Sequence, residues 1–449
     1  GGRHAEAWRY SVVAGDRARE KWANVEAAEF YQRALEAVAS LPAVADADVA
    51  RVWEALAACL QLAGRLEEAA VAFGRARRLT AKGTEAEVVL LRSEGALREA
   101  MGKYSEALRW YGRGLKAAGG LPDEVRLSHE LRLRLQQAQV KFRQGSFGEC
   151  IRAGKQIAEE ALAHQQTETL AATWLMLHVA YTYVGSRERF AFSGLALPLF
   201  EELGDLRGQA LTLLNLGVEA YYEGDWEKAL NLYERSRVLF RRIGDVSYLG
   251  FATNNIGEIL SDQGKLEEAT GLFDEVVRLS GRRDIVVIAR GNLGRAAARA
   301  GRFTDAQDLL REALEEFRQM HAGSFAFETE LRLGELEVLR GGDPEAALLH
   351  TRTILEQAQG ASDMAALRAG ALRVQAAAQL QLGDADGALG TLRESLEVAR
   401  EAGLLYEVAL AQDLLGAACG DAAAAAEAAA LLERLGVQQV ARGEFPARL

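Results

Sequence analysis

Apolar residues recur along this chain at intervals of three and four residues, which is the spacing of one face of an α-helix. Clear stretches run from Trp53 to Leu60 and from Ala69 to Ala76, on either side of Gly64. Prolines, which remove a helical hydrogen-bond donor and clash with the preceding turn, are rare. The alternating strands and Asn-Gly turns of β-hairpins are scarce. The pattern therefore predicts an all-α chain.

Glycines that end helical runs recur about every forty residues, and such a period is the mark of a repeat protein. The clearest copies start with a glycine and end with an alanine five positions later, at residues 64–69, 102–107, 224–229, 264–269 and 301–306. Weaker copies stand at Gly145, Gly185, Gly342, Gly383 and Gly420, and an earlier copy without the glycine runs through Ala27, Tyr31 and Ala34. We predict about eleven helix pairs, each turning at a glycine in the left-handed conformation.

Small and large residues occupy fixed places in these pairs. The position seven residues before the turn glycine is often small, as in Gly95, Gly217, Gly257 and Gly294. The position nine residues after it is often large, as in Tyr111, Tyr233, Phe273 and Leu310. Small residues let two helices approach closely and large ones fill the remaining space. One pair cannot bury its apolar face alone, so we predict an α-solenoid over residues 1–435.

Two units and the C-terminus depart from the pattern. In the unit at residues 185–204, arginine and phenylalanine replace small residues and Pro198 is predicted in mid-helix, so we expect a kink or a register shift. The unit at residues 405–435 is nearly pure alanine from 422 to 430, which suits a terminal cap touching one neighbour. The tail, residues 436–449, is expected to be loose.

The residues of one copy carry a family resemblance. Residues Trp53, Leu56, Ala57, Leu60, Gly64, Ala69, Phe73 and Ala76 resemble a complete tetratricopeptide (TPR) signature, and the pattern covers nearly the whole chain. The resemblance implies a right-handed superhelix of TPR-like helix pairs. A period near forty is longer than the usual 34 of these repeats. It is similar to the repeats of the maltose-activator-like arms of large bacterial ATP-binding regulators.

A narrower resemblance lies in four segments, residues 7–10, 14–18, 24–29 and 255–264. They are similar to the C-terminal repeat arms of bacterial multidomain adenylate/guanylate cyclases, in which a cyclase domain and a signalling ATPase precede the repeats. The resemblance implies a sensor arm belonging to a longer protein, and Gly1-Gly2 opening directly onto a helical pattern agrees with such a piece. Cyclase and ATPase motifs do not occur in this sequence, so neither activity is carried over.

Charge and candidate chemistry exclude several functions. The formal net charge of −11 makes nucleic acid a poor partner, and no apolar stretch reaches the length of a membrane span. Three widely spaced cysteines suit free thiols in a reducing cytoplasm. Phosphate-binding loops and clustered His/Cys spacings do not occur, so we expect no cofactor, metal or catalytic site.

A ladder of asparagines is the one polar pattern that repeats. Asn215, Asn255 and Asn292 each stand nine residues before a turn glycine, about 200° around the helix from the small partner-facing residue. An amide that donates and accepts suits the backbone of an extended peptide in the concave groove. The alternative is that these asparagines hydrogen-bond the helix of the next repeat and set the stacking.

Charged and aromatic residues continue the same face. Tyr222, Asp262 and Arg299 lie seven residues beyond the asparagines, and Glu258 and Arg295 lie three beyond. This mixture predicts a surface for a protein or peptide and not an anion site. We therefore expect a regulatory arm whose occupancy controls an attached ATPase or cyclase. Alternatives are the sensor or oligomerisation arm of a large ATP-dependent transcription regulator and, from a different class, an enzyme with an unrecognised site.

Overall fold

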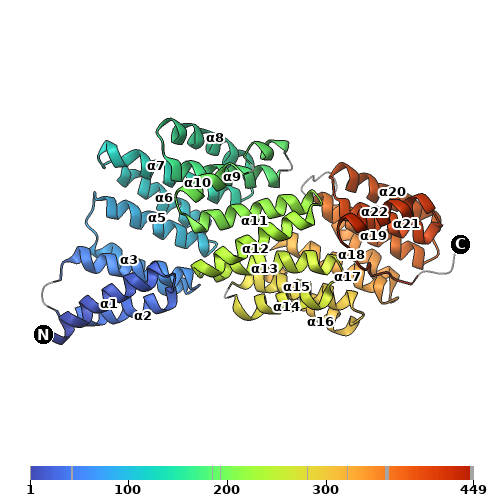
Figure 1. Cartoon of the computed structure of the whole chain (residues 1–449), viewed down its shortest axis with the longest axis horizontal. Coiled ribbons are helices and arrows are strands. Elements are labelled where there is room, and N and C mark those ends of the chain that lie inside the picture. The colour runs from blue at the N-terminus through green and yellow to red at the C-terminus, as the bar shows by residue number, and fades with distance from the viewer. Residues whose placement is uncertain are drawn as a thin grey trace. The chain divides into compact units, whose positions relative to one another are not determined.

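The computed structural model describes residues 2–41, 44–184, 186–192, 194–280, 282–320, 322–358 and 364–444. Within these ranges every regular element is a helix, and 22 α-helices form eleven consecutive pairs (Figure 1). The predicted all-α solenoid of eleven TPR-like pairs is therefore confirmed.

The chain divides into two compact units, which are described separately. Unit 1 comprises residues 1–212 and 238–246, and unit 2 comprises residues 213–237 and 247–449. The helices of unit 1 are α1 (Gly2–Glu20), α2 (Asn24–Val38), α3 (Asp46–Leu62), α4 (Leu66–Leu79), α5 (Glu85–Ala100), α6 (Tyr104–Ala118), α7 (Asp123–Arg143), α8 (Phe147–Ala163), α9 (Thr167–Tyr183), the 3-10 helix η1 (Arg187–Ala191) and α10 (Ala196–Glu202).

The sixth pair, α11 (Leu206–Tyr222) and α12 (Trp226–Ile243), is shared between the units. The other helices of unit 2 are α13 (Val246–Asp262), α14 (Leu266–Leu279), α15 (Arg283–Arg299), α16 (Phe303–Gln319), α17 (Gly323–Leu339), α18 (Pro344–Ala358), α19 (Ala365–Gln381), α20 (Ala385–Glu401), α21 (Leu405–Cys419) and α22 (Ala422–Arg434).

The small and large residues meet within each pair as predicted. A Cβ atom added to Gly217 would lie 2.5 Å from the ring of Tyr233, and one added to Gly257 would lie 2.6 Å from the ring of Phe273. Gly95 with Tyr111 and Gly294 with Leu310 repeat this arrangement. The large side chain therefore fills the space that the missing side chain leaves, and both helices need the glycine to approach so closely.

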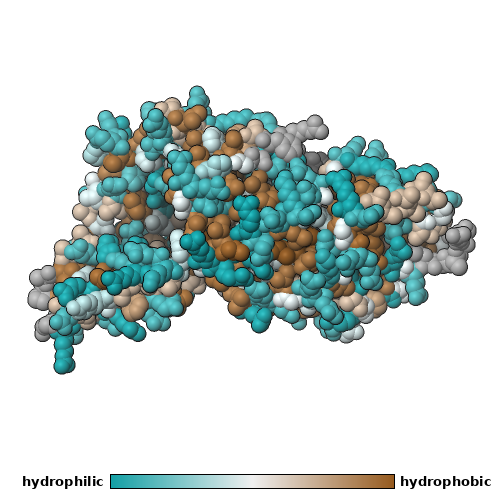
Figure 2. Space-filling model, in the orientation of Figure 1, coloured by the Kyte–Doolittle hydropathy of each residue, from teal (hydrophilic) through white to brown (hydrophobic). Residues whose placement is uncertain are grey.

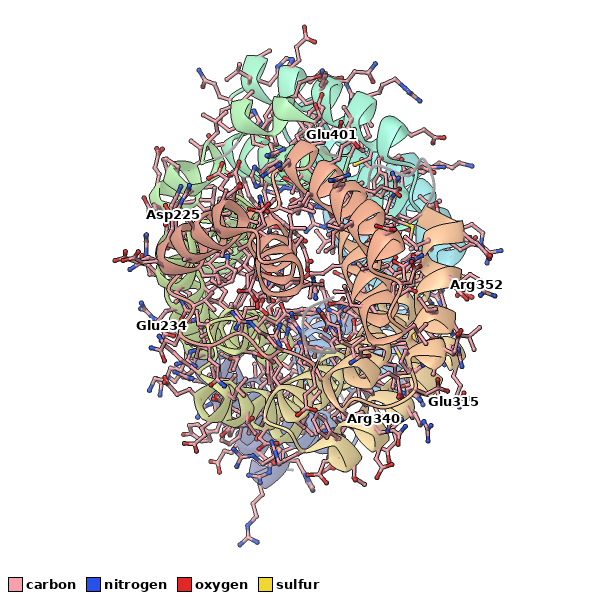
Figure 3. The ribbon with its side chains drawn as sticks, turned by 90° about the vertical axis from the view of Figure 1, so that its right-hand side faces the viewer. Asp225, Glu234, Glu315, Arg340, Arg352 and Glu401 are labelled. Carbon is pink, nitrogen blue, oxygen red and sulfur yellow. The ribbon has the colours of Figure 1, made fainter. Side chains whose placement is uncertain are left out.

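The odd-numbered helices form one layer of the stack. Besides packing on its own partner, α15 contacts α17, α17 contacts α19, and α19 contacts α21. The same holds in unit 1 for α3, α5, α7 and α9. Figure 3 views unit 2 end-on, and the exposed Asp225, Glu234, Glu315, Arg352 and Glu401 lie around its outside. On the face in Figure 2, hydrophobic residues are interspersed with hydrophilic ones.

Pro198 does not lie in mid-helix, which corrects the sequence-based expectation. The second half of its pair consists of η1 and the short α10, so this unit departs from the helix pair seen elsewhere. Pro198 is the third residue of α10, where a backbone N–H has no intrahelical acceptor, so the proline costs little there. Gly185, the predicted turn glycine, lies outside the described residues.

A second correction concerns the ninth turn. The left-handed residue is Gly341, with φ of 60°, and not Gly342. The N–H of Gly342 donates to the carbonyl of Glu337 and closes the turn after α17, which ends at Leu339.

The last pair ends in the alanine-rich α22. Asp421 accepts hydrogen bonds from the N–H groups of Ala423 and Ala424, and the helix buries only Ala424 and Ala428. Residues 436–444, here termed the C-terminal segment, follow α22 without regular secondary structure. They are not loose: hydrogen bonds from Gln438 and Arg442 and to Glu444 attach them to other helices of unit 2. Residues 445–449 of the predicted loose tail lie outside the described part.

Candidate functional site

All eight residues predicted from the repeat pattern lie on α11, α13 and α15 of unit 2. These are odd-numbered helices, so the predicted residues belong to the layer that the stacked repeats share. Three of them, Asp262, Arg295 and Arg299, form an ion cluster, and two others, Glu258 and Asn292, form a hydrogen bond between repeats. Their contacts decide which part of this layer is open to a partner.

The asparagines make contacts between repeats. Asn292 is buried, and its amide nitrogen donates to Oδ1 of Asn254 at 3.1 Å and to Oε1 of Glu258 at 2.8 Å, both on α13. Asn255, partly buried on α13, makes a side-chain hydrogen bond with Tyr233 of the preceding repeat. Asn215 lies partly buried on α11. The contacts of Asn255 and Asn292 are those of the stacking alternative.

Asp262 is the centre of the charged residues that the sequence predicted. Its carboxylate is buried and accepts from Nη2 of Arg295 and Nη1 of Arg299, each at 2.8 Å. Burial alone would raise the pKa of Asp262, but the two guanidinium groups outweigh it and hold the pKa below its ordinary value. The predicted residues thus meet as a buried ion cluster linking α13 to α15. Tyr222, the remaining predicted residue, is half exposed and packs edge-on against Tyr221.

The ion cluster continues through the following repeats. Glu335 on α17 accepts from Arg373 on α19 at 2.7 Å, and Arg373 also donates to Glu407 on α21 at 2.9 Å. Although burial opposes it, Arg332 and Arg373 lower the pKa of Glu335. Charges of opposite sign therefore alternate from repeat to repeat, and each charge named here is paired with one of opposite sign.

Glu258 differs from its neighbours because no cation contacts it directly. Burial and the nearby Glu328 raise its pKa to about 7, against the lowering effects of Asn292 and Arg295. The carboxyl group of Glu258 therefore titrates near neutral pH.

Helix α21, near the end of unit 2, contacts helices from the start of that unit. The ring of Tyr406 lies 5.2 Å from that of Trp226 on α12, and its hydroxyl donates to the carbonyl oxygen of Asp262 at 3.3 Å. Arg299 reaches the same hydroxyl at 3.4 Å. These contacts hold α21 against α12, α13 and α15 beside the ion cluster.

The C-terminal segment lies across the adjoining part of the layer. The N–H of Gln438 donates to the carbonyl of Gln263, and the amide of Gln263 donates to the carbonyl of Leu435 at 3.0 Å. At the other end of the C-terminal segment, the side-chain amide of Gln381 donates to the carbonyl of Glu444 at 3.2 Å. Gln263 follows the end of α13 and Gln381 is the last residue of α19. The segment is therefore held through its backbone between repeats far apart in sequence.

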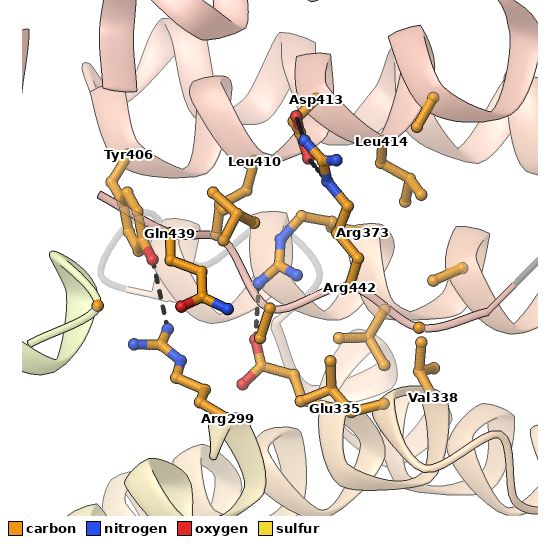
Figure 4. A pocket seen from close by; sticks show the side chains of 18 of the residues that line it. Arg299, Glu335, Val338, Arg373, Tyr406, Leu410, Asp413, Leu414, Gln439 and Arg442 are labelled. Carbon is orange, nitrogen blue, oxygen red and sulfur yellow. Dashed lines mark hydrogen bonds and ion pairs between the residues drawn. The ribbon is translucent and has the colours of Figure 1, made fainter. Parts of the chain in front are cut away.

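A cavity of about 90 Å³ lies beneath the segment (Figure 4). Arg299, Glu335 and Arg373 line it on one side. Leu410 and Leu414 of α21 lie opposite, and Gln439 to Gly443 of the segment form a further wall. In Figure 4 the segment crosses this space as irregular, extended chain, and Arg442 points to Asp413. The site thus joins paired charges, an apolar wall and an extended polypeptide.

Sequence reasoning missed the glutamines that hold this backbone. Gln381 stands two residues before the turn glycine Gly383, as Tyr222, Asp262 and Arg299 do before theirs. Continuing that series by two repeats would have found Gln381. Gln263 and Asp413 carry no such periodic signal.

Metal sites and membrane-spanning helices were the remaining possibilities for the described ranges. No group of three His, Cys, Asp or Glu side chains within them could hold a metal ion. Among the described helices, none combines the length and the apolar character that crossing a bilayer requires.

Comparison with known proteins supports the repeat assignment. Residues 248–319, which contain most of α13 and all of α14 and α15 with α16, match the tetratricopeptide repeat family. These residues are tetratricopeptide repeats. No curated protein matches the chain significantly.

Two solved structures match the chain over most of its length. The apo form of the quorum sensor NprR from B. thuringiensis shares 13% identity at a TM-score of 0.51, over 83% of this chain and 97% of that one. A signal transduction ATPase with numerous domains (STAND) and a tetratricopeptide repeat sensor, from Pyrococcus horikoshii, shares 16% identity at a TM-score of 0.49 over 82% of this chain. This chain spans 56% of the length of that protein. At such identities the likeness to NprR shows the fold alone.

Proposed function

We propose that unit 2 is a regulatory repeat arm that binds a protein or peptide segment in extended form across the ends of α13, α17 and α19. One observation carries the proposal: the C-terminal segment already lies there, bound through backbone groups to Gln263 and Gln381. Backbone hydrogen bonds are independent of side chains and are a general means of holding extended peptides. A surface that holds one extended segment has the shape and the hydrogen-bonding groups for another.

The effector is the second part of the proposal. We propose that occupancy of this surface controls a signalling ATPase or a nucleotide cyclase in a longer protein. The support for this part is the resemblance of segments 7–10 and 255–264 to cyclase-associated repeat arms. A ligand shifts such an equilibrium only by its difference in affinity for the two states, so displacement of the C-terminal segment supplies the two states required.

The test uses the full chain with the substitution Gly443→Val. A Cβ atom at Gly443 would lie 2.5 Å from the carbonyl oxygen of Val338, so the substitution should unseat the C-terminal segment. The probe is a fluorescent nonapeptide with the sequence of residues 436–444, amidated so that Glu444 keeps a neutral carbonyl group. Fluorescence anisotropy should show saturable binding to the variant and at least tenfold weaker binding to the unsubstituted chain, whose own segment competes.

Two controls accompany the titration. Gly271→Val adds the same bulk where a Cβ would meet nothing within 4 Å, and it should bind the peptide no better than the unsubstituted chain. A scrambled nonapeptide should not bind. A folded Gly443→Val chain that fails to bind the nonapeptide would contradict the proposed function. Full protection of residues 437–444 from hydrogen exchange in that variant would contradict the geometry on which it rests.

A further inference from the structure

The side chain of Arg442 makes the most specific contact of the C-terminal segment. Its Nε donates to Oδ2 of Asp413 at 2.8 Å and its Nη2 donates to Oδ1 at 2.5 Å. Only a planar guanidinium can make these two parallel bonds to one carboxylate, so lysine would not replace it fully. The Asp413 side chain is 13% exposed and the Arg442 side chain 57% exposed, so the pair lies at the rim of the site. We expect it to contribute selectivity more than affinity.

The next residue, Gly443, is required for a different reason. The position of its missing Cβ lies 2.5 Å from the carbonyl oxygen and 3.1 Å from Cγ1 of Val338 on α17. The carbonyl oxygen cannot move away easily, because it also accepts from the amide of Gln381 at 2.9 Å. The same amide donates to the carbonyl of Glu444. The side chain of Gln381 thus holds both the carbonyl group of Val338 and the backbone of the C-terminal segment. The space between them is wide enough for a glycine and too narrow for a residue with a side chain.

Resting on the proposed function, we propose that this surface of unit 2 selects an extended peptide in which an arginine is followed by a glycine, with residues 436–444 as its ligand within the same chain. Asp413 recognises the arginine, and Val338 with Gln381 recognises the glycine. A partner protein that presents an Arg-Gly pair in an extended segment competes with the C-terminal segment for this surface. The proposal concerns ligand selection, which the proposed function leaves open.

Peptide variants test the two positions separately on the Gly443→Val chain. Replacing the peptide's arginine by alanine should weaken binding about three- to tenfold, and lysine should recover only part of the loss. Replacing its glycine by alanine should weaken binding more than tenfold, because the added methyl group meets a fixed carbonyl oxygen. Alanine in place of the peptide's glutamate should change little, because Gln381 contacts only the backbone of Glu444.

A double-mutant cycle assigns the arginine to Asp413. Asp413→Asn in the chain should weaken the parent peptide as much as the arginine change does, and it should leave the arginine-free peptide unaffected. Asp308→Asn, an exposed aspartate of α16, is the matched control and should alter no affinity.

The outcomes separate the inference from the proposed function. Equal binding of all peptides would overturn the selection of an Arg-Gly pair while leaving peptide binding in place. Failure of every peptide to bind would contradict both. Light scattering of the unsubstituted chain tests the source of the ligand: concentration-dependent dimers that are lost with Arg442→Ala would show that a second copy supplies the segment, which would overturn its assignment to the same chain.

Discussion

Replacement of Glu258 by glutamine should stabilise unit 2 at alkaline pH and have a much smaller effect in mild acid. Glu258 on α13 accepts a hydrogen bond from Asn292 of the next repeat, and burial raises its pKa from 4.5 to about 7. Glutamine has nearly the same shape and keeps an oxygen that accepts from Asn292. The substitution therefore removes the partly buried negative charge and preserves the contact between α13 and α15.

The sign and size follow from the two pKa values. Between pH 4.5 and about 7 the folded chain keeps a proton on Glu258 that the unfolded chain releases, so stability falls as the pH rises through this window. The loss is complete above pH 7 and amounts to about 3 kcal/mol at most. At pH 5 Glu258 is protonated in the folded chain but already largely ionised in the unfolded chain, so the variant should exceed the parent by only about 1 kcal/mol or less. At pH 8 the variant should exceed the parent by up to about 3 kcal/mol.

Urea unfolding at pH 5 and pH 8 measures this difference, and hydrogen exchange of α13 and α15 locates it in unit 2. Glu312→Gln, at an exposed position of α16, is the matched control and should behave as the parent at both pH values. Equal effects of Glu258→Gln at the two pH values would refute the reasoning. So would a loss of stability at pH 8, since it would mean that the charged carboxylate is preferred.

Two further substitutions examine the inner layer of unit 2. Asn292→Ala leaves buried acceptors on Asn254 and Glu258 without their donor, so thermal unfolding should show a loss of about 1–3 kcal/mol, while nonapeptide binding to the Gly443→Val chain stays unchanged. Weaker peptide binding with unchanged stability would instead support the asparagine groove. Asp262→Asn leaves the guanidinium groups of Arg295 and Arg299 without the carboxylate that they contact directly and should cost about 3–5 kcal/mol at pH 7 in urea unfolding. Because the pKa of Asp262 is lowered in the fold, the deficit should shrink as the pH falls through that pKa, and a deficit independent of pH would argue against the ion cluster.

The sequence was sufficient to predict contacts that depend on neighbouring helices. Gly257 on α13 and Phe273 on α14 lie on adjacent helices joined by a short turn, and their contact follows from the helical period alone. The alignment of Asp262 with Arg299 needs only the constancy of the repeat from one pair to the next. For the same reason the error at the ninth turn is one residue, since two adjacent glycines, Gly341 and Gly342, satisfy the pattern equally well.

Contacts over longer distances in sequence could not be predicted. Tyr406 reaches Arg299 and Trp226 because small rotations between repeats accumulate along unit 2, and one sequence does not state their size. The C-terminal segment was expected to be loose because it has no helical period. Its contacts use the backbone carbonyl of Gln263 and the side chain of Gln381, and only Gln381 continues a periodic position.

The amide chemistry expected of the asparagines is present in unit 2 on other residues. Asn292 lies between two repeats, where removing water from it is compensated by Asn254 and Glu258. Gln263 and Gln381 stand at or beside the ends of their helices, where the layer opens and backbone carbonyl groups of another segment can approach.

The buried ion pairs explain why the amides that bind another segment lie at the helix ends and not between the repeats. Separating these ion pairs to admit a peptide would leave unpaired charges inside the fold. The free-energy cost of those charges exceeds the stabilisation that a few hydrogen bonds to a peptide provide. A ligand is therefore expected at the helix ends, where Asp413 at the rim accepts from the arginine of the C-terminal segment.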